Sequence, residues 1–285
     1  IIFLISFFPL IKLLIRQKPN YFVGYLITLL PLILINCFNF DSKFVLRISG
    51  FPKLGFIRKA LWKFFSKKIY KITCPSKDLK CQLVNLKLFD SKKLFFLPDP
   101  IINIEKFIDK TKSGNNNIYN SKKEFFIAVG RLTKQKNFSY LINEFAKFSN
   151  GNQDYNLLIF GEGEERKNLE NQINSLDLNK KVFLMGFEEN VYSYMKQAKA
   201  LILTSLWEDP GFVIIEASMC NLFVISSDCK NGPSEFLKNG KGGILFKNNK
   251  INELKNSLDK FCLLKDKKKM VLISKKNSKN YTLFS

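Results

Sequence analysis

The chain of 285 residues contains no histidine. Without imidazole, neither a Ser-His-Asp triad nor a Cys-His dyad can form from this sequence. Zinc sites that need a histidine ligand are excluded for the same reason. Any chemistry carried by the chain therefore depends on carboxylates, cationic side chains, hydroxyls, thiols or backbone groups.

Paired cysteines are also lacking. The six cysteines are scattered and none form a C-x-x-C pair, so we interpret them as reduced thiols of a cytosolic protein. The chain begins with Ile1 instead of methionine, which suggests a fragment or a processed form. Its apolar opening run, residues 1–15, has neither the basic start nor the small-residue cleavage site of a signal peptide, so we do not expect one.

Negative charge is scarce at both ends of the chain. The formal net charge is +22, with 46 basic and 24 acidic residues. Residues 1–110 carry +13, residues 111–260 only +3 and residues 261–285 another +6. A large positive charge is compatible with a nucleic-acid or membrane partner. It is equally compatible with a general compositional bias, because Lys, Asn, Ile and Phe are abundant throughout.

One uncharged stretch, Tyr21–Phe38, is long enough to raise the question of a membrane span. Gly24 and Pro31 interrupt it, and we favour a buried strand at Tyr21–Tyr25 followed by a buried helix at Leu26–Cys37. Further elements of this half are predicted as strands at Phe44–Ile48, Ile69–Cys74 and Leu94–Leu97 and a basic amphipathic helix at Phe56–Lys68.

The second half alternates regularly between strands and helices. A polar, Asn-rich stretch at 111–123 is the best linker, so we predict domains at 1–112 and 113–264 with a basic C-terminal helix or tail at 265–285. Repeated strand–helix units indicate a parallel, doubly wound sheet, whose ligands bind at the carboxyl ends of the strands. The strands are predicted at Phe125–Val129, Asn156–Phe160, Val182–Met185, Ala200–Thr204, Phe223–Ser226 and Gly243–Phe246.

Two loops at strand ends contain glycine followed by charge. Gly130 and Arg131 open the loop GRLTKQKN, which also holds Lys134 and Lys136 and is compatible with an anion cradle ahead of a helix. The loop GEGEER from Gly161 is not a dinucleotide fingerprint, because an arginine takes the place of the third glycine. Taken alone, the first loop is better explained as a solvated basic turn, and the second is weak evidence of a site.

A third loop carries two carboxylates. Glu208 follows a predicted strand and Glu216 lies on the first turns of the next helix, with seven residues between the two. Gly211 between them allows a close approach of the backbone, and the helix N-terminus offers N–H groups to a phosphate. We therefore expect both carboxylates to face one cleft, although an arbitrary pair of this kind is more often a capping and a helical glutamate.

As a set, these loops resemble glycosyltransferase family four, the group 1 glycosyl transferases, which are retaining enzymes of GT-B fold. The resemblance rests on GRLTKQKN, LLIFGEGEER, VFLMGF, the E-x7-E signature from Glu208 to Glu216, and SDCKNGPSEFLKNGKGGILF. It is strong over 125–250 and looser over 20–110. It implies an α/β fold of GT-B type, with two Rossmann-like doubly wound parallel-sheet domains facing a cleft and the N-terminal one incomplete, so that the chain is N-terminally truncated.

The resemblance also implies roles for residues. Arg131 and Lys136 correspond to the cations that hold the donor diphosphate, and Glu208 to the group that contacts the transferred sugar. These three are the predicted catalytic residues. Glu216 corresponds to the ligand of the ribose hydroxyls. The remaining predicted donor-binding residues are Gly130, Gly161, Gly186, Phe187, Gly211, Phe212 and Val213, with the base placed near Gly186 and Phe187.

The implied activity is transfer of a sugar from a nucleotide diphosphate onto a glycan or lipid-linked acceptor in surface polysaccharide synthesis. No metal and no other cofactor is expected, because no D-x-D motif occurs and cationic side chains take the phosphate role. We expect a cytoplasmic protein, peripheral on the inner face of the cytoplasmic membrane, with an anionic membrane surface as a further partner and no nucleic acid. Acceptor-side candidates are Arg47, Gly50 and the Lys53–Lys68 region.

Two departures from the family stand out. No Gly-rich opening unit is recognisable in the first half, and the histidine that many relatives place there is missing. The alternatives are a GT-B enzyme of another class, such as a sugar-nucleotide epimerase or a phosphorylase, and a basic membrane- or nucleic-acid-binding protein. No motif for a pyridoxal-phosphate lysine, zinc finger or RNP sequence supports these alternatives.

Overall fold

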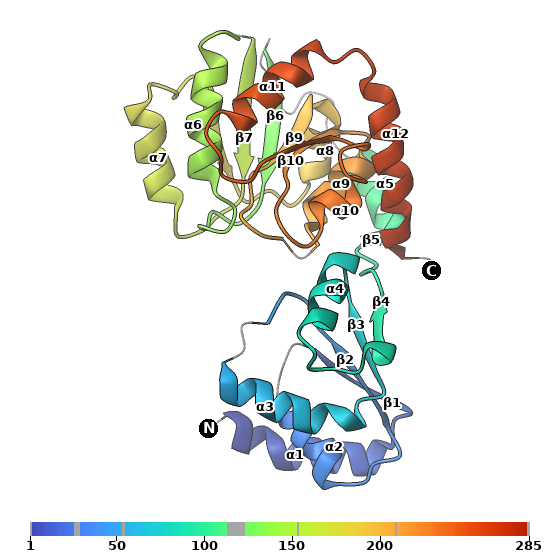
Figure 1. The fold of residues 1–285 in the computed structure, drawn as a ribbon. Coiled ribbons are helices and arrows are strands. Elements are labelled where there is room, and N and C mark those ends of the chain that lie inside the picture. The colour runs from blue at the N-terminus through green and yellow to red at the C-terminus, as the bar shows by residue number, and fades with distance from the viewer. Residues whose placement is uncertain are drawn as a thin grey trace. The chain divides into compact units, whose positions relative to one another are not determined.

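A computed structural model describes residues 2–25, 29–52, 55–112, 123–152, 154–208 and 210–283 (Figure 1). The chain divides into two compact units, Ile1–Pro98 and Asp99–Ser285. Each unit is built on its own parallel sheet.

The first unit contains a four-stranded sheet in the order β1-β2-β3-β4, all parallel. The predicted strands and the amphipathic helix of this half are confirmed, with small shifts of their ends. The apolar run at the start of the chain forms a helix that contains Pro9. The elements are α1 (Ile2–Gln17), β1 (Tyr21–Tyr25), α2 (Leu29–Cys37), β2 (Lys43–Arg47), α3 (Phe56–Phe65), η1 (Ser66–Lys68), β3 (Lys71–Cys74), α4 (Lys77–Asn85), η2 (Ser91–Lys93) and β4 (Leu94–Phe96).

The uncharged stretch Tyr21–Phe38 divides into β1 and α2, with residues 26–28 outside the described part. None of the helices described is both long enough and apolar enough to cross a membrane.

In the described part of the first unit, helices cover one face of this sheet. Side chains of α2, α3 and α4 pack with Phe44, Leu46 and Ile72 into a core around the fully buried Trp62. The prediction that β1 is buried was wrong. Tyr21, Val23 and Tyr25 are 55%, 46% and 68% exposed, because alternate residues of a strand face opposite sides of a sheet and these face the uncovered one.

Lysines lie across this uncovered face. Lys43 Nζ is 5.9 Å from the centre of the Tyr21 ring and 5.1 Å from that of Tyr70. Lys71 Nζ lies 5.0 Å from the centre of the Phe95 ring. These separations are within the range of cation–π attraction, so the aromatic rings of this face are partly covered by basic side chains of the same sheet.

The second unit contains a six-stranded parallel sheet in the order β11-β10-β9-β6-β7-β8. All six strands predicted for this half are confirmed to within one residue at each end. The elements are β5 (Ile102–Asn103), α5 (Ile104–Lys112), β6 (Glu124–Val129), α6 (Phe138–Ser149), β7 (Tyr155–Phe160), α7 (Arg166–Ser175), β8 (Val182–Gly186), α8 (Val191–Gln197), β9 (Ala200–Leu203), α9 (Phe212–Met219), β10 (Phe223–Ser227), α10 (Pro233–Phe236), β11 (Ile244–Phe246), α11 (Glu253–Leu263), α12 (Lys267–Ser278), η3 (Lys279–Tyr281) and β12 (Thr282–Leu283).

Both faces of this sheet are buried, as a parallel sheet requires. Along β6, Phe126 and Ala128 pack into a core with side chains of α6, α7 and α11. The alternating Phe125 and Ile127 pack into a second core with side chains of α8 and α9. The chain runs outward from β6 to β8 and returns on the other side at β9, so the strand order reverses between β6 and β9.

The boundary between the units lies earlier than the one predicted at 112. The two-residue strand β5 pairs with β12, and Lys110 of α5 forms an ion pair with Glu189 beside α8, so the segment after Pro98 belongs to the second unit. The predicted C-terminal tail is likewise part of this unit. Its helix α12 packs on α9, and Tyr281 is 5% exposed. Residues 113–122 of the predicted linker lie outside the described residues.

Candidate donor site at the strand ends

The loops after β6 and β9 lie where the strand order of the second unit reverses. In open parallel sheets this is the position at which ligands bind, beyond the carboxyl ends of the strands. The two loops are hydrogen-bonded to each other, because Leu206 N donates to Gln135 O (2.8 Å) and Thr204 Oγ1 donates to Lys136 O (2.9 Å). The structure therefore brings two of the predicted loops together at one point.

An ion pair between Lys136 and Glu208 joins these loops. The distance from Lys136 Nζ to Glu208 Oε1 is 2.5 Å, and the two side chains are 15% and 6% exposed. Ser205 Oγ donates to the same carboxylate oxygen at 2.5 Å. A carboxylate this deeply buried needs such partners, because removing a charge from water costs several kcal/mol per ion. Glu208 and Lys136 were both predicted site residues, and Ser205 was not.

Gly130 leaves room for the lysine. A Cβ atom at this position would lie 3.0 Å from Lys136 Cε and 3.1 Å from its Cδ, which is closer than ordinary van der Waals contact. The lysine stem therefore passes directly over the end of β6 on its way to Glu208. This close passage accounts for a glycine immediately after the strand.

The loop after β7 brings its backbone against the first loop. A Cβ atom on Gly161 would lie 2.0 Å from Gly130 O, and Gly161 has φ +136°, which side chains rarely permit. Gly161 N donates to Gly186 O at 2.7 Å, so the ends of β6, β7 and β8 are held together. Arg166 has a structural role, since it pairs with Glu162 and Glu170. Helix α7 begins at Arg166, and the acidic residues of the loop precede its first turn.

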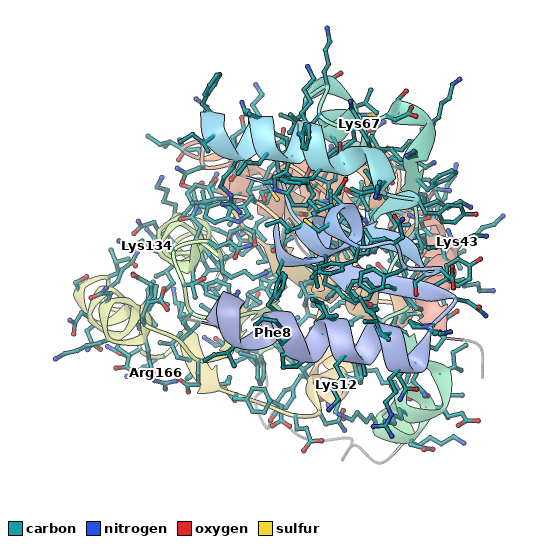
Figure 2. The ribbon with its side chains drawn as sticks, turned by 90° about the horizontal axis from the view of Figure 1, so that it is seen from below. Phe8, Lys12, Lys43, Lys67, Lys134 and Arg166 are labelled. Carbon is teal, nitrogen blue, oxygen red and sulfur yellow. The ribbon has the colours of Figure 1, made fainter. Side chains whose placement is uncertain are left out.

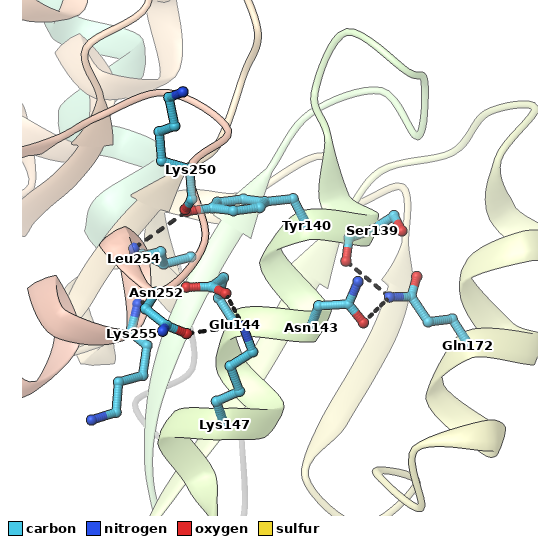
Figure 3. A network of polar contacts seen from close by, with 10 residues as sticks. All are labelled: Ser139, Tyr140, Asn143, Glu144, Lys147, Gln172, Lys250, Asn252, Leu254 and Lys255. Carbon is cyan, nitrogen blue, oxygen red and sulfur yellow. Dashed lines mark hydrogen bonds and ion pairs between the residues drawn. The ribbon is translucent and has the colours of Figure 1, made fainter.

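A polar network fixes the helix that follows the first loop (Figure 3). Glu144 of α6 is 2% exposed and lies 2.6 Å from Lys147 Nζ. Lys147 also donates to Asn252, at the start of α11, at 3.0 Å. On the other side, Gln172 of α7 donates to Asn143 Oδ1 at 2.8 Å. Helix α6 is thus bonded to both of its neighbours, which keeps the loop at its N-terminus in place.

Glu216 lies on α9, as predicted, and has a different partner from Glu208. Tyr192 Oη, from α8, donates to Glu216 Oε1 at 3.2 Å. Burial raises the pKa of Glu216 above its usual value of 4.5, and the Tyr192 hydrogen bond and the charge of Lys110 oppose that shift. The two carboxylates of the signature are therefore held by separate contacts. Glu208 is held by Lys136, across the reversal of strand order, and Glu216 is held by Tyr192, between α8 and α9.

The N-terminus of α9 begins next to Glu208. Gly211 is its N-cap residue with φ +84°, and a Cβ atom there would lie 3.4 Å from Glu208 Cγ. No side chain caps the helix in the described part of the chain, where Asp209 is not included. The first N–H groups, including those of Phe212 and Val213, are the kind that bind anions at helix starts.

The other predicted residues lie at the ends of neighbouring strands. Arg131 is exposed directly after β6, and it forms no ion pair with the acidic residues in the described ranges. Gly186 ends β8 with φ +78°, and Phe187 after it is 78% exposed. Arg47, an acceptor-side candidate, is 5% exposed and donates from Nη1 to Leu97 O at 2.7 Å, so its guanidinium supports the first unit.

Sequence reasoning missed Ser205 and Tyr192. Ser205 is the second residue after β9, and its position beyond a strand end is a signal that could have identified it. Tyr192 gives no such signal, because its contact with Glu216 depends on how α8 packs against α9. The nearby Cys229 is not a nucleophile candidate, since burial raises the pKa of its thiol to about 12.

Residues 109–280 match the family described as glycosyl transferases group 1. An uncharacterized glycosyltransferase of Methanocaldococcus jannaschii is 30% identical over 255 residues, which cover 81% of this chain and 61% of that protein. The N-acetylgalactosamine-N,N'-diacetylbacillosaminyl-diphospho-undecaprenol 4-alpha-N-acetylgalactosaminyltransferase of Campylobacter jejuni is 36% identical over 124 residues, 44% of this chain and 33% of that protein. The chain thus spans less than two thirds of either relative.

Among solved structures, Anabaena HepE in complex with UDP superposes with a TM-score of 0.79 at 18% identity. The match covers 96% of this chain and 78% of that one. At this identity the likeness establishes the fold, and it includes both units.

We predict that Lys136→Met destabilises the second unit by about 3–5 kcal/mol, because Glu208 is left buried without its cation. Combining Lys136→Met with Glu208→Gln should recover part of that loss, since the unpaired charge is then removed. The measurement is urea unfolding followed by circular dichroism. The control Lys134→Met removes an exposed lysine of the same loop and should change stability by less than about 0.5 kcal/mol. Equal losses for both lysine variants would contradict the importance of the pair.

We predict a pH-dependent gain of stability for Glu216→Gln. Burial raises the pKa of this carboxyl in the folded chain, so ionisation costs stability as the pH rises through the folded value. The Gln variant does not ionise and should exceed the wild type in stability at about pH 8, with the difference vanishing at about pH 3, where both folded and unfolded carboxyls are protonated. Thermal unfolding across this range measures it. Glu164→Gln, at an exposed site, is the control, and a difference independent of pH would refute the assignment.

Proposed function

Because this chain belongs to the group 1 glycosyl transferases, we propose that it is a retaining glycosyltransferase that uses a nucleotide-diphosphate sugar. Its fold is of the GT-B type, with a parallel sheet in each unit. The observation that carries the proposal is the Lys136–Glu208 pair beside the N-terminus of α9, at the reversal of strand order. The acceptor is a glycan or a lipid-linked glycan, a class supported by the Campylobacter relative that acts on a diphospho-undecaprenol compound. The two relatives named above are glycosyltransferases, which gives no support to the epimerase or nucleic-acid alternatives.

In the proposed reaction, the donor diphosphate meets Arg131, Lys136 and the first N–H groups of α9. Lys136 donates one of its three N–H bonds to Glu208, and the other two remain for phosphate oxygens. As the bond from the anomeric carbon to the phosphate oxygen breaks, negative charge grows on the leaving nucleoside diphosphate. Cations and N–H groups held in place before the reaction stabilise this charge more in the transition state than in the ground state.

Glu208 binds the transferred sugar. In the described structure, Lys136 and Ser205 both bond to Oε1 of this carboxylate, so Oε2 is the oxygen that accepts from a sugar hydroxyl. The acceptor hydroxyl attacks the anomeric carbon from the side of the leaving group, and its proton passes to the departing phosphate oxygen. This route retains configuration without a protein nucleophile, and it does not require a histidine.

Glu216 accepts hydrogen bonds from the ribose hydroxyls. Its carboxylate is held by Tyr192, and a diol bound here would donate hydrogen bonds to a carboxylate that burial has largely removed from water. The base lies near Gly186 and Phe187, whose ring is 78% exposed and offers a face for stacking. Catalysis needs no metal, because Arg131 and Lys136 supply the positive charge at the diphosphate.

We expect thermal stability to rise on titration with a UDP- or GDP-sugar, by about 2.7 kcal/mol when the ligand is at 100 times its dissociation constant. EDTA should leave the shift unchanged. Arg131→Ala should weaken binding at least tenfold, whereas Lys180→Ala, an exposed lysine just before β8 at the opposite strand ends, should not. No shift with any nucleotide sugar would count against the proposal, and product analysis by NMR would decide whether configuration is retained.

We further propose that α3 lies on the anionic inner surface of the cytoplasmic membrane. The exposed fractions of Phe56, Ile57 and Phe64 are 89%, 74% and 67%, and basic residues are interleaved with them along the helix. The opposite side of α3 is fixed in the core by Trp62. Apolar rings next to lysines are typical of helices that bind at the lipid headgroup level. Figure 2 shows the helices of this unit, with Lys67 just beyond α3.

The membrane proposal predicts binding to vesicles with about 30% anionic lipid and little binding to neutral ones, because each nearby cation contributes about 1 kcal/mol at an anionic surface. Lys59→Gln should therefore reduce sedimentation with anionic vesicles about fivefold. Phe56→Ser should reduce it further by removing apolar burial, while Ile251→Ser, a 79% exposed position of the second unit, should have no effect. Vesicle binding that does not depend on lipid charge or on salt would contradict the proposal. The net charge of +22 would then be explained by compositional bias.

A further inference from the structure

A cavity of about 400 Å³ lies in the second unit at the amino ends of the strands, whereas the candidate donor site lies at the carboxyl ends. The cavity is bordered by Lys199 and Phe223, at the amino ends of β9 and β10. Residues from the last turn of α8, the segment that ends α9 and the first turns of α12 complete its wall. The volume is within the range of pockets that hold small organic ligands.

The interior of this cavity is apolar. Met195, Leu222 and Phe223 are almost fully buried beneath it, and Cys220 is 7% exposed. Leu272 of α12 borders the opening and is 65% exposed. A hydrocarbon group entering the cavity would therefore remove water from an existing apolar surface, including a leucine that is now largely solvated.

The rim is basic. Four lysines line the cavity, and no acidic residue is among the described residues that line it. Lys199 is paired with Glu124, and Lys196 donates to Thr111 O at 2.8 Å. The ammonium groups of the other two, Lys267 and Lys268, form no ion pair within the described ranges, although Lys267 Nζ lies 4.2 Å from the centre of the Phe261 ring.

The start of α12 lies at the rim, where the exposed carboxylate of its N-cap residue Asp266 opposes the positive end of the helix dipole. This helix has 12 residues, and Asp266 makes no side-chain capping hydrogen bond. Its first N–H groups therefore stand beside Lys267 and Lys268 at the opening. An apolar interior with a cationic rim is complementary to a molecule that has a hydrocarbon chain and an anionic head.

We propose that this cavity binds one molecule of a single-chain anionic lipid, with its hydrocarbon chain against Leu272 and Phe223 and its phosphate or carboxylate at Lys268 and Lys267. The site is separate from the donor site, because it lies at the amino ends of strands whose carboxyl ends carry the donor loops. The proposal does not depend on the glycosyltransferase activity.

The test is calorimetric titration of the full chain with dodecyl phosphate below its micelle concentration. We expect one bound molecule per chain. Dodecyl maltoside, which has the same chain and no charge, should bind at least tenfold more weakly, and inorganic phosphate should show no measurable binding. Arg131→Ala should leave the affinity unchanged.

Matched variants locate the site. Lys268→Gln and Leu272→Ser should each weaken binding at least fivefold, whereas Lys269→Gln and Leu263→Ser, at exposed neighbouring positions that do not line the cavity, should change it less than twofold. Circular dichroism checks that each variant is folded. The proposal is overturned by absence of binding, by equal affinity for the neutral detergent or for inorganic phosphate, or by equal effects of the lining and control variants.

Discussion

The ion pair between Lys136 and Glu208 is the interaction on which the candidate donor site depends. It joins the loops after β6 and β9 across the reversal of strand order, and both side chains are largely buried. A buried carboxylate is stable only with a close cation and further donors, which here are Lys136 and Ser205. Within the described residues this pair leaves N–H groups of the lysine and Oε2 of Glu208 without another protein partner, so one contact both holds the fold and is available for the proposed chemistry.

Close approaches between backbone segments fix the position of the rest of the site relative to this pair. Gly161 approaches Gly130 so closely that no side chain fits between them, and Gly130 lets the Lys136 stem pass. These glycines are not the fingerprint of a dinucleotide site. They allow three strand ends to meet at one edge, where diphosphate, sugar and ribose are proposed to bind side by side.

The sequence was sufficient to predict what depends on local pattern. The strands of the second unit were recognisable in the sequence because each is a short apolar run followed by a loop. The partners of Glu216 and the packing of α12 were not, since they depend on contacts between segments far apart in the chain. The burial of β1 was predicted wrongly for a related reason. An apolar run indicates a strand, but whether helices cover both of its faces is decided elsewhere.

That uncovered face of the first unit has a consequence for how the protein behaves in concentrated solution. Tyr21, Val23 and Tyr25 form an apolar strip along a strand that pairs only with β2 in the described structure. Such strips favour association between copies, and charge at a sheet edge opposes it. Lys43 and Lys71 lie over the aromatic rings of this sheet and place positive charge beside the strip, so the strips of two copies of the chain repel each other. Salt screens this repulsion between lysines, so copies of the chain associate more readily as the ionic strength rises.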